Sequence, residues 1–176
     1  MMISFIGYRA TGKTTLGREL AQRLDYRFID SDAEIERLAG KSIASIFAED
    51  GELYFRDMEE KIIGEICGQD GIILATGGGA VMREVTRKNL QAAGPVIWLT
   101  ASAETIFRRM AADVNNSQTR PNLTSQGGLD EIRQLMAVRE PFYRSLATLT
   151  VETENFSPQE LIEQIFLEIS HMYFQK

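Results

Sequence analysis

The residues best suited to chemistry form a glycine-rich loop near the start of the chain. Residues 7–14 read GYRATGKT, which fits the pattern G-x-x-x-x-G-K-[ST], and they follow the apolar run 2–6. A buried strand that turns into a helix through glycine directs backbone N–H groups and the helix dipole at one point, which favours an anion. Lys13 would reach the β- and γ-phosphates of a nucleotide, and the Thr14 hydroxyl would bind Mg²⁺. The alternative is a chance match in an ordinary turn, but the flanking strand and helix favour a phosphate-binding loop.

Two carboxylates follow the next short strand. Asp30 and Asp32 stand at the carboxyl end of a strand predicted for residues 27–30. In an extended segment their side chains point the same way, whereas a turn would separate them. Beside a magnesium nucleotide, one carboxylate would work with the metal or its waters, and the other would orient or deprotonate an acceptor hydroxyl. The alternative is that Asp30 or Ser31 only caps the next helix.

Three consecutive glycines, Gly77, Gly78 and Gly79, follow an apolar strand predicted for residues 71–75. A tight turn that needs a positive φ is one explanation. Three glycines exceed what one turn requires, and they would let a substrate approach bare backbone whose N–H groups can bind an anion. Because loops at strand ends often carry ligands, we favour a binding role.

Three arginines outside the loop are candidates for binding an anionic small molecule. Arg56, Arg120 and Arg139 each carry a planar guanidinium that can pair with carboxylate or phosphate through two hydrogen bonds. Charged residues are mostly exposed, so a solvated surface position is the default explanation for each. Arg120 stands out because it lies in the long polar stretch 113–128, whose closing would bring it onto a transferring phosphoryl group.

Short apolar strands alternate with helical segments along the chain. Strands are predicted at residues 2–6, 27–30, 71–75, 95–99 and 148–151, and several are apolar throughout. This pattern predicts an α/β fold in which helices cover both faces of a parallel sheet. Ligands in such folds bind outside the carboxyl ends of the strands, so the loop at Gly7, the aspartate pair and the glycine triplet should converge on one crevice. The last strand alternates in polarity, which places it nearer an edge.

Local signals also mark where individual helices begin. Ser42 is expected to cap a helix over residues 43–48. Ser157 and Glu160 form a capping box, with Pro158 at the first helical position. A helix over residues 129–143 is expected after the polar stretch.

The composition is that of an ordinary soluble globular domain. The 176 residues are 44% hydrophobic and 25% charged, with a net charge of −6. A negative chain lacks the positive field that non-specific binding to nucleic acid or anionic membranes needs. An anionic substrate must therefore be held by a local cluster of Arg and Lys. No apolar run approaches the roughly 18 residues of a transmembrane helix.

The remaining signals concern compartment and assembly. The first predicted strand follows Met1 directly, without a basic segment or a small-residue cleavage site, so we expect no signal peptide. Cys67 is the only cysteine, which excludes an internal disulfide and suits a reducing cytoplasm; its isoleucine neighbours indicate a buried, inert thiol. His171 is expected at the surface without a catalytic role. We expect a monomer that binds neither nucleic acid nor membrane.

Together these motifs resemble the shikimate kinase family over nearly the whole chain. The resemblance implies a three-layer α/β/α fold of the nucleoside-monophosphate-kinase type, a P-loop kinase fold with a five-stranded parallel sheet. It also implies one kinase domain over residues 1–176 with a mobile lid at about residues 113–126. The segments that carry it are GYRATGKT at 7–14, FIDSD at 28–32, IFAEDGE at 46–52 leading to Phe55 and Arg56, GGGA at 77–80, Arg120-Pro121, and REPFY at 139–143.

The resemblance also implies a reaction and an acceptor site. The γ-phosphoryl group of ATP would move to the 3-hydroxyl of shikimate, giving shikimate 3-phosphate and ADP on the route to aromatic amino acids. Asp32 would bind the shikimate hydroxyls and act as the base. Arg56 and Arg139 would hold the substrate carboxylate, together with the backbone of Gly77, Gly78 and Gly79.

On the nucleotide side, the resemblance assigns further roles residue by residue. Lys13 and the lid residue Arg120 would act on the transferring phosphoryl group, and Asp30 would help Thr14 to place Mg²⁺, directly or through water. Arg109 would cover the adenine. The full set expected to contact ATP is Gly7, Ala10, Thr11, Gly12, Lys13, Thr14, Thr15, Arg109 and Arg120.

One position departs from the family pattern, and two other functions stay open. Many members have glycine where this chain has Ala10, so Ala10 would be strained by about 1 kcal/mol if the backbone there needs a positive φ. The nearest alternative function is another small-metabolite kinase of the same fold, for example one acting on gluconate. The other is a nucleotide-binding regulatory module without turnover.

Overall fold

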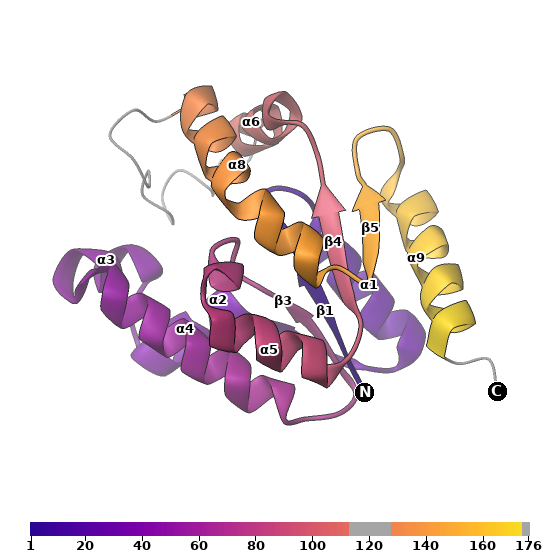
Figure 1. The fold of residues 1–176 in the computed structure, drawn as a ribbon, viewed down its shortest axis with the longest axis horizontal. Coiled ribbons are helices and arrows are strands. Elements are labelled where there is room, and N and C mark those ends of the chain that lie inside the picture. Colours follow the sequence, from indigo (N-terminus) through magenta and orange to yellow (C-terminus); the bar gives the residue numbers. More distant parts are fainter. Residues whose placement is uncertain (113–127, 174–176) are drawn as a thin grey trace.

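A parallel sheet of five strands forms the centre of the molecule (Figure 1). The computed structural model describes residues 1–112 and 128–173. The strands run in the order β2-β3-β1-β4-β5, and each neighbouring pair is parallel. The predicted sheet is confirmed, and β5 lies at an edge, as its alternating sequence indicates. The strand bounds are β1 (Met2–Ile6), β2 (Arg27–Asp30), β3 (Ile72–Ala75), β4 (Val96–Thr100) and β5 (Leu149–Glu152).

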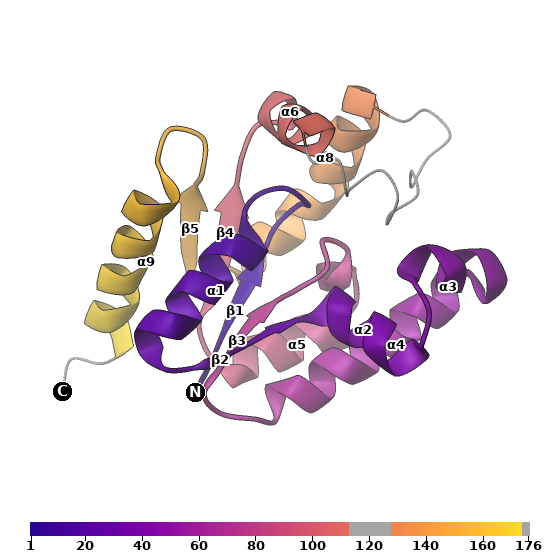
Figure 2. The ribbon, with the colours of Figure 1, turned by 180° about the vertical axis from the view of Figure 1, so that it is seen from behind.

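Helices cover both faces of this sheet. On one face lie α1 (Lys13–Leu24) and α9 (Pro158–Tyr173) (Figure 2). On the other lie α4 (Gly51–Cys67), α5 (Glu84–Ala93) and α8 (Gly128–Leu146). Further elements are α2 (Ser31–Ala39), α3 (Ile43–Glu49), α6 (Ala103–Ala112) and a 3₁₀ turn (Ala80–Met82). Across residues 1–112 and 128–173, no helix combines the length and the apolar character needed to span a bilayer.

Burial on both faces explains why the strands read as continuous apolar runs. All five residues of β1 are buried. Ile3 and Phe5 pack with residues of α1 and α9, whereas Met2 and Ile6 pack with residues of α4 and α5. Successive side chains of a strand point to opposite faces, so a central strand between two helical layers must be apolar at nearly every position.

The predicted helix caps are present. The Ser42 hydroxyl accepts a hydrogen bond from the Ser45 N–H at the start of α3. At the start of α9, the Ser157 N–H donates to the Glu160 carboxylate at 2.7 Å, and the Glu160 N–H donates to the Ser157 hydroxyl at 3.3 Å. Such bonds satisfy backbone N–H groups that have no partner within the helix.

Ser31 joins two strand ends at the carboxyl edge of the sheet. It is the first residue of α2 and is fully buried. Its hydroxyl accepts a hydrogen bond at 2.9 Å from the N–H of Gly77, just beyond β3. Ser31 therefore fixes the start of the glycine triplet relative to the end of β2.

We expect Ser31→Ala to lower the free energy of unfolding by about 1–3 kcal/mol, because the Gly77 N–H would stay buried without an acceptor. Urea denaturation followed by circular dichroism measures this difference. The matched control is Ser145→Ala at an exposed position of α8, which should change stability by less than about 0.5 kcal/mol. Equal stability of the two variants would contradict the role assigned to Ser31.

Candidate active site

A pocket opens at the carboxyl edge of the sheet, where the polar loops were expected to converge. Its volume is ≈ 560 Å³, part of it open to solvent. Segments that follow β1, β2 and β3 all contribute to its wall, as the parallel topology requires. The convergence predicted from the sequence is confirmed. The charged lining consists of Arg9, Asp32, Arg56, Glu59 and Arg139, and the glycine triplet supplies bare backbone.

The phosphate loop connects β1 to α1 and leaves the first turn of that helix open. Gly12, the residue before α1, has φ 98° and no side chain to cap the helix, so the first N–H groups can face an anion. Lys13 is largely buried, and its ammonium group donates to the carbonyl oxygens of Gly7 and Tyr8 at 2.9 and 2.8 Å. The Thr11 hydroxyl donates to the same Tyr8 carbonyl at 2.8 Å. These bonds keep the loop curled around the start of α1.

Ala10 has the positive φ that would strain a residue with a side chain. Its φ is 61°, in the left-handed region that residues other than glycine adopt at a cost of about 1 kcal/mol. The rest of the loop therefore outweighs the preference of this one residue. The backbone at this position therefore does adopt a positive φ, which is the case in which strain at Ala10 was expected.

Asp30 serves two purposes at once. Its Oδ1 accepts hydrogen bonds from the N–H groups of Asp32 and Ala33 at 3.0 and 3.4 Å, so it caps α2. Its Oδ2 accepts a hydrogen bond at 2.9 Å from the hydroxyl of Thr14. Asp30 therefore caps α2, but capping is not its only contact, because its second oxygen lies beside the phosphate loop. Two neighbouring oxygen ligands of this kind suit Mg²⁺, which is commonly held by one or two protein groups together with phosphates and waters.

Asp32 lies apart from Asp30, because α2 begins between them. It is 8% exposed and lines the pocket. A Cβ atom on Gly77 would lie 2.6 Å from both Asp32 Oδ1 and Glu59 Oε1. The start of α2 therefore separates the two carboxylates: Asp30 lies beside Thr14 of the phosphate loop, and Asp32 lines the pocket.

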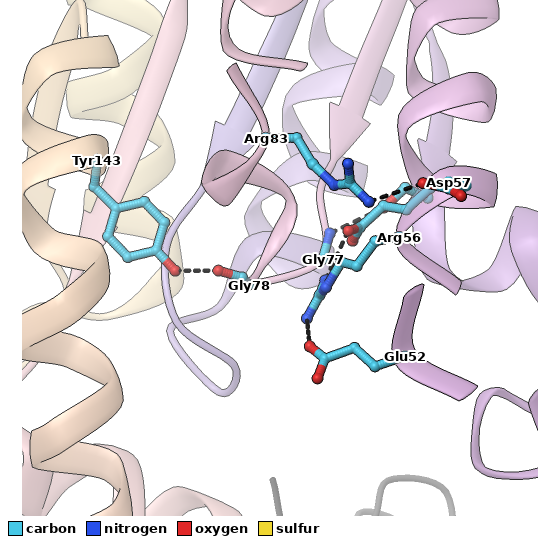
Figure 3. Close-up of polar contacts among 9 residues, drawn as sticks. Glu52, Arg56, Asp57, Gly77, Gly78, Arg83 and Tyr143 are labelled. Atoms are coloured by element: carbon cyan, nitrogen blue, oxygen red, sulfur yellow. Dashed lines mark hydrogen bonds and ion pairs between the residues drawn. The ribbon is translucent and has the colours of Figure 1, made fainter. Parts of the chain in front are cut away.

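The glycine triplet is needed for close packing and not for a turn with positive φ. Gly77, Gly78 and Gly79 are absent from the described glycines with positive φ, and Gly79 has φ −95°. The explanation that a tight turn requires a positive φ at these glycines is wrong. A Cβ on Gly79 would lie 2.5 Å from the Arg56 guanidinium, and the Gly78 carbonyl accepts a hydrogen bond from the Tyr143 hydroxyl (Figure 3). Side chains reach this backbone only because it is bare.

Arg56 projects from α4 toward the triplet, held by two carboxylates (Figure 3). Its guanidinium lies 2.7 Å from Glu59 and 3.4 Å from Glu52. Glu59 is 1% exposed and was not among the site residues predicted from the sequence. The available signal was its spacing, because Glu59 lies four residues after Phe55 and three before Ile62, on the apolar side of the helix.

Burial changes the chemistry of Glu59. Desolvation raises the pKa of its carboxyl to about 7, with the Arg56 guanidinium opposing the rise and the nearby Asp32 carboxylate adding to it. The pocket therefore contains a carboxyl group that gains or loses its proton near neutral pH. Perturbed groups of this kind are common in functional sites.

Arg139 reaches the pocket from α8, whereas Arg56 reaches it from α4. It is 7% exposed, and its guanidinium carbon lies 5.5 Å from the centre of the Tyr8 ring. Tyr8 is itself buried, although the loop motif marks its position only as variable. A guanidinium over an aromatic face is held in orientation as well as in place.

Arg109 lies beside the phosphate loop. It donates to the hydroxyl and carbonyl oxygens of Thr153 at 2.9 and 2.6 Å, and to the Ala10 carbonyl at 3.4 Å. These bonds tie α6 to the segment after β5 and to the loop. Arg120 and the lid expected at about residues 113–126 lie outside the described residues.

Cys67 was expected to be a buried, inert thiol, and His171 was expected to lie at the surface. Cys67 is partly buried at the end of α4, and burial raises the pKa of its thiol to about 11. A thiol of this pKa is protonated at neutral pH and is a poor nucleophile. His171 is exposed on α9, as expected, and it does not line the pocket.

Comparison with known proteins identifies the family. A family model described as shikimate kinase matches residues 9–170. The chain belongs to the shikimate kinase family. A shikimate kinase from Pseudomonas syringae pv. syringae is 41% identical over 167 residues, which are 95% of each chain. One from Pseudomonas aeruginosa is 42% identical over 160 residues, or 91% of each chain.

Solved structures agree with this family and with the predicted P-loop kinase fold. A shikimate kinase from Acinetobacter baumannii in complex with shikimate has a TM-score of 0.91 at 34% identity, and the alignment covers 99% of this chain and 95% of that one. A gluconokinase from Sinorhizobium meliloti has a TM-score of 0.64 at 16% identity, covering 99% and 97%. At 16% identity, the similarity to the gluconokinase shows a shared fold alone.

The buried Glu59 carboxyl predicts a pH-dependent stability. Its pKa of about 7 in the folded chain exceeds the ordinary value of 4.5, so between these values the folded state binds more protons than the unfolded state. The free energy of unfolding should therefore fall as pH rises through this window. At about 1.4 kcal/mol per pKa unit, this contribution is at most about 3 kcal/mol.

Glu59→Gln should remove this contribution. Urea denaturation at several pH values across the window compares the variant with the wild type. Glu65→Gln, at an exposed position of the same helix, is the control and should keep the wild-type slope. If the free energy of unfolding of Glu59→Gln changed with pH as steeply as that of the wild type, Glu59 would be shown to titrate at its ordinary pKa.

Proposed function

We propose that this protein transfers the γ-phosphoryl group of ATP to the 3-hydroxyl group of shikimate, giving shikimate 3-phosphate and ADP on the route to aromatic amino acids. One observation carries the proposal: the phosphate loop faces a carboxylate, guanidinium groups and bare glycine backbone across a single pocket. Phosphoryl transfer depends mainly on positioning and electrostatic stabilisation, which this arrangement offers. Membership of the family and likeness to a shikimate kinase solved with shikimate support this substrate.

On the donor side, the loop from Gly7 to Thr15 would bind the phosphates of ATP through its N–H groups and Lys13. The hydroxyl of Thr14 and Oδ2 of Asp30, which are hydrogen-bonded to each other at 2.9 Å, would hold Mg²⁺, directly or through water. When bound, this ion supplies positive charge to the β- and γ-phosphates. Arg109 would contact the adenine, a role supported by its place beside Ala10.

On the acceptor side, Arg56 and Arg139 would hold the shikimate carboxylate, with the N–H groups of Gly78 and Gly79 as further donors. Asp32 would accept a hydrogen bond from the reacting hydroxyl. Glu59 and Glu52 hold the Arg56 guanidinium in place before the substrate arrives. Guanidinium groups fixed in this way lose little freedom on binding.

During the reaction, the 3-hydroxyl oxygen would form a bond to the γ-phosphorus as the bond to the β–γ bridging oxygen breaks, and ADP leaves. Asp32 would take the hydroxyl proton. Lys13 would stabilise negative charge on the phosphoryl oxygens. The same role for Arg120 stays a prediction, since Arg120 and the lid lie outside the described residues.

We also propose that the chain acts as one kinase domain, as a monomer in the cytoplasm, without binding nucleic acid or membranes. The net charge of −6 supports the last point, because both of those surfaces attract positive proteins. The single cysteine supports a reducing compartment.

The pocket favours a cyclic acceptor over gluconate. Ile43, Phe47 and Phe55 form an apolar part of its wall, and the two phenyl rings lie 4.9 Å apart between centroids. The carbon face of a ring can pack on such a wall, whereas an open-chain polyol presents hydroxyl groups on every side and would leave them without partners.

A coupled assay of ADP release with Mg-ATP tests the function, using shikimate, gluconate and nucleoside monophosphates as acceptors. We expect turnover with shikimate, and we expect Asp32→Asn to lower kcat by about 10²–10⁴-fold because the hydroxyl proton loses its acceptor. Asp57→Asn, at an exposed position of α4, is the control. Turnover with none of the acceptors would favour a regulatory module, and preference for gluconate would favour the alternative kinase.

Arg139→Lys should raise the KM for shikimate by about tenfold and leave the KM for ATP within about twofold, because an ammonium group cannot pair with a carboxylate through two parallel hydrogen bonds. Steady-state kinetics with each substrate varied in turn measures both values. Arg144→Lys, on the exposed side of the same helix, is the control. An unchanged KM for shikimate would remove Arg139 from the acceptor site.

A further inference from the structure

Arg9 brings a charged side chain from the phosphate loop into the acceptor pocket. It lines the pocket together with Asp32, Arg56 and Arg139. The loop backbone here also lies against the glycine triplet, since a Cβ on Gly78 would be 3.6 Å from the Arg9 nitrogen. Arg9 therefore stands where the donor and acceptor halves of the site meet, and the roles proposed for the other residues do not involve it.

The Arg9 guanidinium lies beside one carboxylate, and one of its donor atoms has no acceptor among the described residues. Its Nη2 lies 3.7 Å from Oε1 of Glu131, in the first turn of α8, and the two side chains are only 12% and 2% exposed. That distance fits an ion pair but exceeds a hydrogen bond. The Nε atom is buried and has no hydrogen-bond partner among the described residues. A buried donor without an acceptor costs free energy, which a bound anion would recover.

One aromatic ring and one helix position both Arg9 and Arg139. Their guanidinium carbons lie 5.9 and 5.5 Å from the centre of the Tyr8 ring. Glu131 and Arg139 both belong to α8, separated by eight residues or about 12 Å along its axis. The two guanidinium groups are therefore fixed relative to each other, one belonging to the phosphate loop and the other to α8.

The position of Arg9 determines which negatively charged group it can contact. Arg56 and Arg139 already account for the carboxylate of the acceptor. The part of the acceptor that must approach the phosphate loop is the reacting hydroxyl, because the γ-phosphate lies on that loop. The negative charge at this junction is that of the phosphoryl group in transfer and, afterwards, of the new phosphate ester.

We propose that Arg9 is a further catalytic residue that binds the phosphoryl group during its transfer and the phosphate of shikimate 3-phosphate after it. This inference rests on the proposed function. Arg9 forms no covalent bond and moves no proton: the γ-phosphorus exchanges its bond to ADP for one to the 3-hydroxyl oxygen, and Asp32 receives the proton. The N–H groups of Arg9 stabilise the phosphoryl oxygens throughout, while Glu131 holds the guanidinium in place.

Arg9→Met keeps the length of the side chain and removes its charge and donors. We expect kcat to fall by about 10²-fold, as is typical for the loss of one preorganised donor to a transition-state anion. Calorimetric titration should show at least about tenfold weaker binding of shikimate 3-phosphate, one charged contact being lost, while shikimate itself binds within about twofold of wild type. Arg9→Lys should restore part of both losses, because it retains the charge.

Three controls keep this test decisive. Wild-type turnover with shikimate is measured first, so a wrong function is recognised before Arg9 is judged. Arg37→Met, an exposed arginine of α2 that is 65% exposed, should leave kcat and both affinities unchanged. If Arg9→Met fails to fold because the buried Glu131 carboxylate loses its contact with Arg9, the double variant Arg9→Met/Glu131→Gln removes both charges and should show the same loss of product affinity.

Two results would overturn the proposal. One is an active wild type together with a folded Arg9→Met variant whose kcat and product affinity are unchanged. The other is an equal loss of affinity for ATP, shikimate and product, which would show that Arg9 only maintains the shape of the loop.

Discussion

The site depends on charged side chains packed directly against bare backbone. A methyl group on Gly77 or Gly79 would lie within 2.6 Å of Asp32, Glu59 or Arg56. Charges buried this deeply are costly unless they are paired, and the carboxylates and guanidinium groups of the pocket lie beside one another. The wall is therefore organised before a substrate enters. A substrate anion meets groups that are already desolvated and held in place, which strengthens each contact.

The sheet brings this arrangement together from distant parts of the chain. The donor loop follows β1, Asp32 follows β2, and the glycine triplet follows β3, while α4 and α8 supply the arginines from either side. The start of α2 matters as much as the strands, because it turns Asp30 toward Thr14 and leaves Asp32 in the wall of the pocket. A single turn of helix thus gives two aspartates, two residues apart, different chemical surroundings.

Several site residues could be predicted because their chemistry is visible locally. The GYRATGKT loop, Asp32 and the glycine triplet lie at strand ends, where a parallel sheet places ligands. The physical reason why glycine is needed at these positions could not be predicted, since no local signal shows that Arg56 and Asp32 pack against this backbone. Glu59, Tyr8 and Arg9 were missed for the same reason. Their importance comes from burial and from partners far away in the sequence.

The sequence by itself determined the order of strands and helices, the parallel sheet, the phosphate loop and the family, because periodicity, caps and motif spacing are local properties. Only the tertiary structure decided which charges are buried and which groups face each other. Burial sets the raised pKa of Glu59, and the approach of α8 to the loop sets the pairing of Arg9 with Glu131. Both depend on how distant elements pack, and packing distances are not encoded in any single stretch of residues.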